Sequence, residues 1–338
     1  MARYVGVDID SKYIRIVELE PAKKSWKVIT YGAISSPVLQ PILDSKEDIK
    51  EVGNRIKQLI KEVRVSGKNI STAIPEAQAF TQVITTPLLS QKEMDSAMKW
   101  QAEQYIPLPL EDVSFGYNIL QKDEKSNTMR VLISAAPLNL IAKYNQLIQA
   151  AGLNPLNIET RILGSIRALS RNVPDDYVSA VIELGEYSSD FAFFTKSNIL
   201  FTHSISTGGR AITRAISQEF NLNVEQAERY KLTYGVDPNQ LEGKVYNAIK
   251  PLIDQFVHGL NNGFVYFREQ YPNLRVNLVF LTGEGSLMPG VVRLVAEQFG
   301  VEAQRGDPFA GLSFNKGVQA PSSSGAAFTT AVGLAMIK

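Results

Sequence analysis

The 338-residue chain contains no cysteine and only two histidines, His203 and His258. Without cysteine there is no disulfide, no zinc-thiolate site and no cysteine nucleophile, which fits a reducing compartment. His203 lies in a strand-like stretch and His258 in a long helix-like stretch, so neither has a second histidine at the spacing of metal ligands. We therefore expect both histidines to be structural, and we predict no protein metal site.

The chain also lacks an excess of charge of one sign and any long apolar run. The 35 basic and 34 acidic residues nearly cancel, so we predict no nucleic-acid partner. No stretch approaches the roughly 18 continuous apolar residues of a membrane span, and residues 1–10 lack the apolar segment of a secretory signal. We expect a cytoplasmic protein whose connection to a membrane comes through a partner.

The length and the periodicity of the chain predict two similar lobes. A chain of 338 residues exceeds one ordinary core. Alternating and helical apolar patterns predict a first unit of three strands, a helix and a strand, at residues 4–9, 14–20, 26–34, 46–63 and 69–75. Residues 178–216 repeat three strands and a helix that is opened by "GG". Such a duplication suggests a ligand cleft between the lobes.

The two units can be overlaid at their first turns. "VDIDSKYIRIV" on "IELGEYSSDFAFF" places Asp8 over Glu183 and Asp10 over Gly185, with a slightly longer loop in the second copy. Between the units, residues 78–152 break the symmetry as an insert with a strand, a hairpin and two helices. The first of these helices has a capping box in which Ser90 is the cap and Glu93 the reciprocal partner.

After the second unit the pattern predicts further helices and strands. We expect a helix through "VEQAERYKLTYG", a long helix at about 245–271, the strand "VNLVFLT", a helix opened by Pro289, the strand "VEAQR" and a final helix over 325–338. Glu228 and Lys231 lie three residues apart in the first of these helices, where a surface ion pair is the ordinary interpretation.

Turns between strands suggest a phosphate site. The turns at 6–15 and 181–190 could direct backbone N–H groups and a carboxylate toward a phosphate and its metal ion. Arg15 could return to the phosphates as a cation, or could be a solvated strand residue. The stretch "LTGEGSLMPG" could let the backbone approach a flat ligand, although taken by itself it is more often a plain tight turn.

Taken together, the stretches 6–15, 131–137, 181–190, 281–287 and 325–335 resemble the actin-like ATPase superfamily, and more narrowly the PilM family of type IV pilus assembly proteins, relatives of FtsA. The pieces that carry this resemblance are "LTGEGSLMPG" with "GDPFAGL", "GGRAITRAI" with "EQAERYK", "EQYIPLPLEDVSFGY" and "AVGLA". The resemblance spans nearly the whole chain.

The resemblance implies a two-lobed actin-like α/β fold, a ribonuclease H-like duplication with an FtsA-type 1C insert. The implied boundaries are 1–77, 153–177 and 321–338 for subdomain 1A, 78–152 for 1C, 178–210 and 275–320 for 2A, and 211–274 for 2B.

The resemblance also implies a nucleotide site with ATP and Mg²⁺ as cofactors. The implied nucleotide-binding residues are Asp8, Ser11, Arg15, Gly185, Ser188, Gly208, Gly209, Glu228, Lys231, Gly283, Gly285 and Ser286. Asp8 and Glu183 are the catalytic candidates.

Three positions depart from the family pattern in ways unfavourable to nucleotide. Asp10 replaces a glycine, Glu183 replaces an aspartate, and Glu284 interrupts the glycines of the adenosine turn. Two like charges about 4 Å apart at an effective dielectric constant of about 20 repel by roughly 4 kcal/mol. We therefore expect a weakened ATP site and, at most, a very slow ATPase.

By the same resemblance the expected function is that of an adaptor. PilM proteins capture the cytoplasmic tail of PilN, an inner-membrane protein, in a groove between subdomains 1A and 1C, and form a ring or collar with other pilus assembly proteins. In this sequence we expect the groove to use Ile106, Leu108, Leu110 and Phe115, unless these form the core of the insert. The alternatives are a small-molecule kinase of the superfamily and an FtsA- or MreB-like filament former, and the machine could be a related secretion system.

Overall fold

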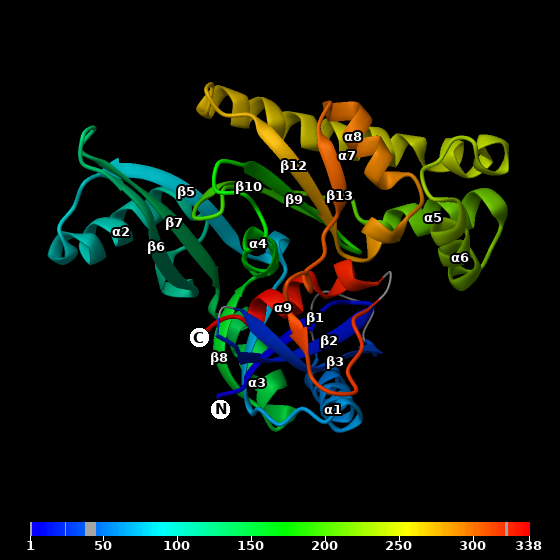
Figure 1. Cartoon of the computed structure of the whole chain (residues 1–338), viewed down its shortest axis with the longest axis horizontal. Helices are drawn as coiled ribbons and strands as arrows, with labels where there is room; N and C mark the ends of the chain where they lie inside the picture. The colour runs from blue at the N-terminus through cyan, green and yellow to red at the C-terminus, as the bar shows by residue number, and fades with distance from the viewer. Residues whose placement is uncertain (1, 24, 38–44, 322–323) are drawn as a thin grey trace.

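The computed structural model describes residues 2–23, 25–37, 45–321 and 324–338. Within these ranges the chain forms two lobes, each built on a mixed sheet, and a smaller insert that lies beside them (Figure 1). This is the two-lobed α/β architecture that the sequence predicts. The two units that repeat in the sequence form the two large sheets.

The sheet of lobe 1 has six strands. Their spatial order is β14 (Ser313–Phe314), β3 (Trp26–Ser35), β2 (Tyr13–Pro21), β1 (Tyr4–Ile9), β4 (Asn69–Ile74) and β8 (Asn154–Thr160). The first three strands of the chain form an antiparallel meander, as their alternating apolar residues predict. β4 and β8 then add in parallel, so that the ends of β1 and β4 lie at the same edge.

Helices α1 (Lys46–Val63) and α3 (Leu138–Ala150) cover one face of this sheet. Ser45 caps α1 and exchanges hydrogen bonds with Asp48 in a capping box, and Arg64 ends the helix in a left-handed conformation. The predicted helix at 46–63 is therefore confirmed. α3, predicted as part of the insert, packs with α1 in the core of lobe 1.

The sheet of lobe 2 has five strands. Their order is β11 (Ile199–Ile205), β10 (Ser189–Phe194), β9 (Val178–Leu184), β12 (Val276–Thr282) and β13 (Glu302–Arg305). The helices of this lobe are α5 (Gly209–Phe220), α6 (Val224–Tyr234), α7 (Lys244–Gln270) and α8 (Val291–Phe299). The long helix α7 buries phenylalanine and aliphatic side chains against the sheet, as its periodicity predicts.

The first turns of the two lobes have the same length. Asp8 pairs with Arg15 in lobe 1, and Glu183 pairs with Asp190 in lobe 2, each at the next-to-last position of its strand. The overlay of Asp8 on Glu183 is confirmed. The expectation of a longer second loop is wrong, because four residues lie between the last strand pairs in both turns.

Of the two helices that lie between the sheets, one was not predicted and the other was predicted to be longer. Helix α4 (Arg161–Ser170) lies between the lobes together with α9 (Thr329–Leu334), and both occupy the centre of the molecule (Figure 1). The two helices touch at Gly164 and Gly333, where a Cβ atom on Gly333 would lie 1.8 Å from the Gly164 carbonyl oxygen. The predicted final helix is shorter than expected, because residues 325–328 form a separate 3₁₀ turn, η5.

The insert is a three-stranded antiparallel sheet with one helix. Its strand order is β5 (Phe80–Pro87), β7 (Thr128–Pro137) and β6 (Val113–Asp123), and α2 (Gln91–Tyr105) packs on one face. Glu93 accepts hydrogen bonds from the backbone N–H of Ser90, at 2.9 Å, and from its hydroxyl, so the predicted reciprocal contact is confirmed. Strand β6 forms one edge of this sheet.

Short 3₁₀ helices connect several of these elements. They are η1 (Glu76–Gln78), η2 (Leu110–Asp112), η3 (Gln240–Gly243), η4 (Glu284–Leu287) and η5 (Gly325–Phe328). η1 joins lobe 1 to the insert, and η4 follows β12 where "LTGEGS" was expected to turn.

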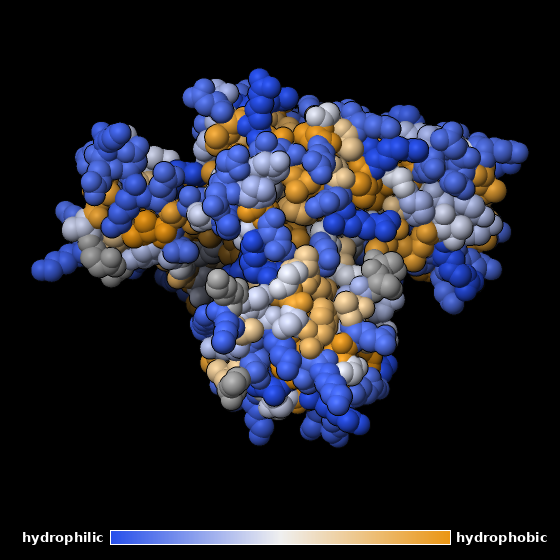
Figure 2. All heavy atoms as spheres, viewed as in Figure 1, coloured by the Kyte–Doolittle hydropathy of each residue, from blue (hydrophilic) through white to orange (hydrophobic). Residues whose placement is uncertain are grey.

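The surface carries polar side chains throughout. Figure 2 shows hydrophilic residues over all parts of the visible face, with hydrophobic residues between them. None of the helices in the described ranges is long and apolar enough to cross a membrane.

Candidate ligand cleft between the lobes

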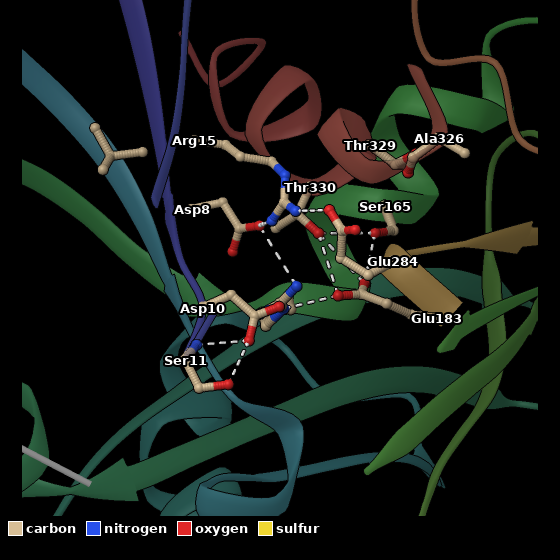
Figure 3. A network of polar contacts seen from close by, with 12 residues as sticks. Asp8, Asp10, Ser11, Arg15, Ser165, Glu183, Glu284, Ala326, Thr329 and Thr330 are labelled. Atoms are coloured by element: carbon tan, nitrogen blue, oxygen red, sulfur yellow. Dashed lines mark hydrogen bonds and ion pairs between the residues drawn. The ribbon is translucent and has the colours of Figure 1, made fainter. Parts of the chain in front are cut away.

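The first turn of lobe 1 uses its own donors. Asp10 donates its backbone N–H to the Tyr13 carbonyl at 2.9 Å, which closes the turn. Its side-chain Oδ1 accepts hydrogen bonds from the Ser11 backbone N–H at 2.6 Å and from the Ser11 hydroxyl at 3.1 Å (Figure 3). The carboxylate of Asp10 therefore occupies the anion position that these donors would offer to a phosphate.

Arg161, the first residue of α4, is the central cation of the cleft. Its Nε donates to Glu183 Oε1 at 2.7 Å, its Nη1 lies 3.2 Å from Asp10 Oδ2, and its Nη2 lies 3.4 Å from Asp8 Oδ2. Each edge of the planar guanidinium thus faces a different carboxylate, an arrangement that a lysine could not reproduce. Arg161 is 8% exposed, so these contacts are little screened by water.

Glu183 joins lobe 2 to the two central helices. Besides Arg161 Nε, its carboxylate accepts a hydrogen bond from the Ser165 hydroxyl of α4 at 2.8 Å and lies 3.3 Å from the Thr330 hydroxyl of α9. Figure 3 shows Ser165 of α4 and Thr330 of α9 pointing toward Glu183. The carboxylate of Glu183, one of the two catalytic candidates, is therefore held by this chain's own donors.

Arg15 reaches from β2 to the opposite lobe. Its guanidinium pairs with Glu284 of η4 and lies 3.9 Å from Asp8 Oδ2 (Figure 3). The alternative of a solvated strand residue is wrong, because Arg15 is 2% exposed. Glu284, expected to obstruct an adenosine, instead gives this interlobe ion pair its anion.

A second ion pair crosses the cleft at Lys12. Its Nζ lies 2.5 Å from Glu228 Oε1 of α6, and Glu228 Oε2 lies 2.8 Å from Lys231 Nζ. Lys231 also donates to the Gly209 carbonyl and to the Thr213 hydroxyl, and it is buried. The ordinary interpretation of Glu228 and Lys231 as a surface ion pair is therefore wrong.

The N-terminus of α5 is also satisfied locally. The backbone N–H groups of Gly209 and Arg210 donate to the carbonyls of Gly185 and Glu186, each at 2.9 Å. Gly208 is required there, since a Cβ atom would lie 2.5 Å from the Glu186 oxygen. These N–H groups, the usual anion donors of a helix start, are taken by the second turn.

The remaining predicted residues support the turns. The hydroxyl of Ser188 donates to Asp190 at 3.3 Å, and the hydroxyl of Ser286 donates to the Gly283 carbonyl at 2.7 Å. Gly283 has a φ of +76°, and a Cβ atom on Gly285 would lie 2.6 Å from the Leu184 Cβ. The glycines of this turn therefore let η4 approach the end of β9.

The pKa values reflect how these charges are paired. Burial raises the pKa of Asp8 to about 6, although Arg161 and Arg15 oppose the rise. Burial also acts on Asp10, but the two guanidinium groups and the Ser11 donors outweigh it and hold its pKa below the usual value. For Glu228, burial is outweighed by Lys231 and by hydrogen bonds from Lys12, Lys231 and Thr213, which lower its pKa to about 2.

The cleft does not fit a nucleotide and its metal ion. Its cavity measures about 60 Å³, whereas small-molecule sites usually span roughly 300–1,000 Å³. Four carboxylates and one guanidinium line it, a balance that repels polyphosphate; the charged residues are Asp10, Arg161, Glu183, Glu186 and Asp190. Within the described ranges, no group of three or more acidic or histidine side chains is arranged to hold a metal ion.

The residues expected in a partner groove divide into two groups. Ile106 is buried in the core of the insert, and Leu110 and Phe115 pack against the same core. Leu108 is exposed on 45% of its surface. Phe115 also lines a hollow of about 220 Å³ beside β6 that reaches α4 and β8.

Sequence reasoning did not identify Arg161, although its guanidinium contacts three carboxylates of the cleft. Its helix does carry a signal, because Ile162, Ile166 and Leu169 recur at helical spacing after Thr160. The partners of Arg161 lie up to 153 residues away in the sequence, and no local pattern indicates them.

A family model described as "Type IV pilus assembly protein PilM" matches residues 6–338. The cell division protein FtsA of Neisseria meningitidis is 24% identical over 310 residues, which cover 83% of this chain and 70% of that protein. FtsA of Streptococcus pneumoniae is 19% identical over 348 residues, covering 89% of this chain and 74% of that protein.

Solved structures with the same fold include a PilM-PilN type IV pilus biogenesis complex, with a TM-score of 0.87, 23% identity, and coverage of 98% of this chain and 97% of that chain. MreB 5 of Spiroplasma citri bound to AMPPNP has a TM-score of 0.55 and 8% identity, with 98% of this chain and 95% of that chain covered. These similarities establish the actin-like fold.

Proposed function

Because this chain belongs to the type IV pilus assembly protein PilM family, we propose that it is an actin-like adaptor that binds the N-terminal tail of an inner-membrane, PilN-like protein. The similar PilM-PilN complex supports this choice of partner. The adaptor would work at the cytoplasmic face of the inner membrane, attached through that partner, in a type IV pilus or a related secretion machine. We also propose that it contacts other pilus assembly proteins and that copies of this chain associate into a ring.

The observation that carries the proposal is the groove along β6. Two adjoining hollows of about 400 and 220 Å³ share Gly116, Ser134, Glu159 and Leu163 as lining residues. They lie over the face of the insert sheet that carries Gly116 of the edge strand β6 and Ser134 of the central strand β7. The opposite wall is formed by α4 and β8 and, in the larger hollow, also by residues 195–199 of lobe 2. An extended peptide could add to β6 through backbone hydrogen bonds and place alternate side chains in the hollows.

This groove lies between the insert, β8 of lobe 1 and α4, and its larger hollow also borders the turn between β10 and β11 of lobe 2. Since α3 packs with lobe 1, we propose residues 80–137 as the compact part of the insert, within the boundaries 78–152 expected from sequence. The other subdomain boundaries, including 211–274 for 2B, remain part of the proposal. Of the residues predicted for the groove, Phe115 lines it.

Substitution of Gly116 tests the groove. A Cβ atom at Gly116 would meet nothing within 4 Å, so Gly116→Glu should fold normally while its side chain enters the groove. We expect it to weaken binding of a synthetic PilN-like tail peptide by at least about tenfold, measured by fluorescence anisotropy.

The matched variant is Leu108→Asp, on the exposed loop where the sequence predicts the tail to lie. Loss of binding in Gly116→Glu alone supports the β6 groove. Loss in Leu108→Asp alone would move the site to the loop, and undetectable binding of the peptide to the parent protein would contradict the proposed partner.

A further inference from the structure

Three sets of ion pairs connect the lobes across the cleft. Arg161 pairs with both Asp10 and Glu183, Arg15 pairs with Glu284, and Lys12 pairs with Glu228. Asp10 and Lys12 lie in the first turn of lobe 1 and Arg15 lies in β2, while Arg161 begins α4 between the lobes. The glutamates Glu183, Glu284 and Glu228 all lie in lobe 2. The groups that a bound polyphosphate would bring together are therefore already joined to one another.

The donors of the cleft are engaged in the same way. Asp10 takes the N–H and the hydroxyl of Ser11, and the second turn takes the N–H groups of Gly209 and Arg210. A phosphate would have to displace an internal acceptor at each of these places, and it would gain no net hydrogen bond by doing so.

We propose that Arg161 is a built-in counter-cation, and that the ion pairs of this chain, rather than a nucleotide and its metal, hold the two lobes closed at the cleft. The guanidinium offsets part of the charge of the three carboxylates that face one another there, as a divalent ion would in an active ATPase. The apolar side chains of α4 pack against the sheet of lobe 2, and this packing holds α4 to that lobe. The ion pairs therefore determine only how far the cleft opens. This inference does not depend on the identity of the partner.

This arrangement explains why the first turn carries Asp10 where the family pattern has a glycine. An aspartate at this position repels a polyphosphate, but it also supplies the acceptor that pairs with Arg161 Nη1. Its carboxylate connects the first turn to α4 and fills the anion position of that turn. Asp10 and Arg161 are therefore complementary, and together they replace the ligand.

The distance between the lobes tests the proposal directly. The chain has no cysteine, so spin labels can be placed at Lys57→Cys on α1 and Gln298→Cys on α8, both exposed positions. We expect the distance distribution of the parent protein to be the same with and without millimolar Mg-ATP. We expect the double variant Lys12→Met with Glu284→Gln to show a broader, longer distribution, because it removes two partially exposed interlobe pairs.

The control removes the same kinds of charge outside the cleft. Lys250→Met with Glu242→Gln breaks exposed pairs within lobe 2 and should leave the distribution unchanged. Shortening of the parent distance by Mg-ATP would overturn the proposal. An unchanged distribution in the cleft double variant, with native circular dichroism, would overturn it as well.

Calorimetric titration with Mg-ATP provides a second test. Asp10→Gly frees both Ser11 donors and one edge of Arg161, so it should bind Mg-ATP at least about tenfold more tightly than the parent protein. Equal binding by both proteins, at any affinity, would show that Asp10 does not compete with phosphate.

Discussion

Replacing Arg161 with glutamine is expected to lower the free energy of unfolding by roughly 3–5 kcal/mol, because it leaves buried carboxylates without their shared cation. Asp8, Asp10 and Glu183 converge on this one guanidinium, and each is buried or nearly so. Urea unfolding at neutral pH measures the loss. The loss should shrink toward pH 5, because burial raises the pKa of Asp8 to about 6 and its protonation removes one of these carboxylate charges.

Two control variants separate this effect from general damage to α4. Arg167→Gln removes another arginine of the same helix, one that pairs with Glu159 and is about one-third exposed, and should cost about 1 kcal/mol or less. Arg161→Lys keeps the charge but not the three donor edges, and should lie between the parent and Arg161→Gln. A loss in Arg161→Gln no larger than that in Arg167→Gln would contradict the central role of Arg161.

Replacing Glu76 with glutamine is expected to stabilise the protein at alkaline pH. Glu76 lies in η1, where lobe 1 meets the insert, and it is 6% exposed. Burial, with a further contribution from Asp190, raises its pKa from 4.5 to about 8, while Thr160 and Thr81 oppose the rise and Glu183 adds to it. At neutral pH the side chain is therefore protonated, and its Oε2 has no hydrogen-bond partner in the described part of the chain.

The direction of the pH effect follows from the raised pKa. The folded state binds the proton of Glu76 more tightly than the unfolded state, so this contribution is complete below about pH 4.5 and is lost as the pH rises through about 8. Glutamine keeps the neutral shape and loses no proton. Glu76→Gln should therefore differ little from the parent protein at pH 5 and exceed it at pH 9 by a few kcal/mol, on the order of 1.4 kcal/mol for each unit of pKa shift.

Urea unfolding across this pH range measures the difference. Glu103→Gln, at an exposed glutamate of α2, is the control and should follow the parent protein at every pH. If Glu76→Gln keeps the same dependence on pH as the parent protein, Glu76 is ionised in the folded state and the predicted pKa shift is wrong.

The periodicity of the sequence was sufficient to predict most of the fold. Local structure follows from the apolar pattern, which alternates in the strands and recurs every three or four residues in α1 and α7, because the apolar side chains must face a core. The register of the two first turns followed from the same alternation, which aligned Asp8 with Glu183. α4 and β8 were missed because their short apolar patterns stand beside a stretch rich in polar and turn residues.

The cleft could be predicted only in part. The resemblance pointed to some of the residues that line it, such as Ser11, Glu183 and Gly185, but not to Arg161, and it did not indicate the contacts among them. An acidic residue at Asp10 has opposite consequences depending on which cation it faces, and that cation is supplied by an element far along the chain. The partner of Glu284, likewise, lies on the other lobe. Charge pairing across a cleft depends on the tertiary structure, so it cannot be predicted from the spacing of residues along the chain.

The central claim is that this protein binds its partner tail with lobes that its own ion pairs hold closed. The most direct measurement is the dissociation constant of the PilN-like tail peptide, determined by fluorescence anisotropy with and without millimolar Mg-ATP. The account predicts the same dissociation constant in both conditions, because nucleotide has no differential interaction through which to shift the lobes. A change of tenfold or more, about 1.4 kcal/mol of coupling, would show that nucleotide controls the partner groove and would contradict the account.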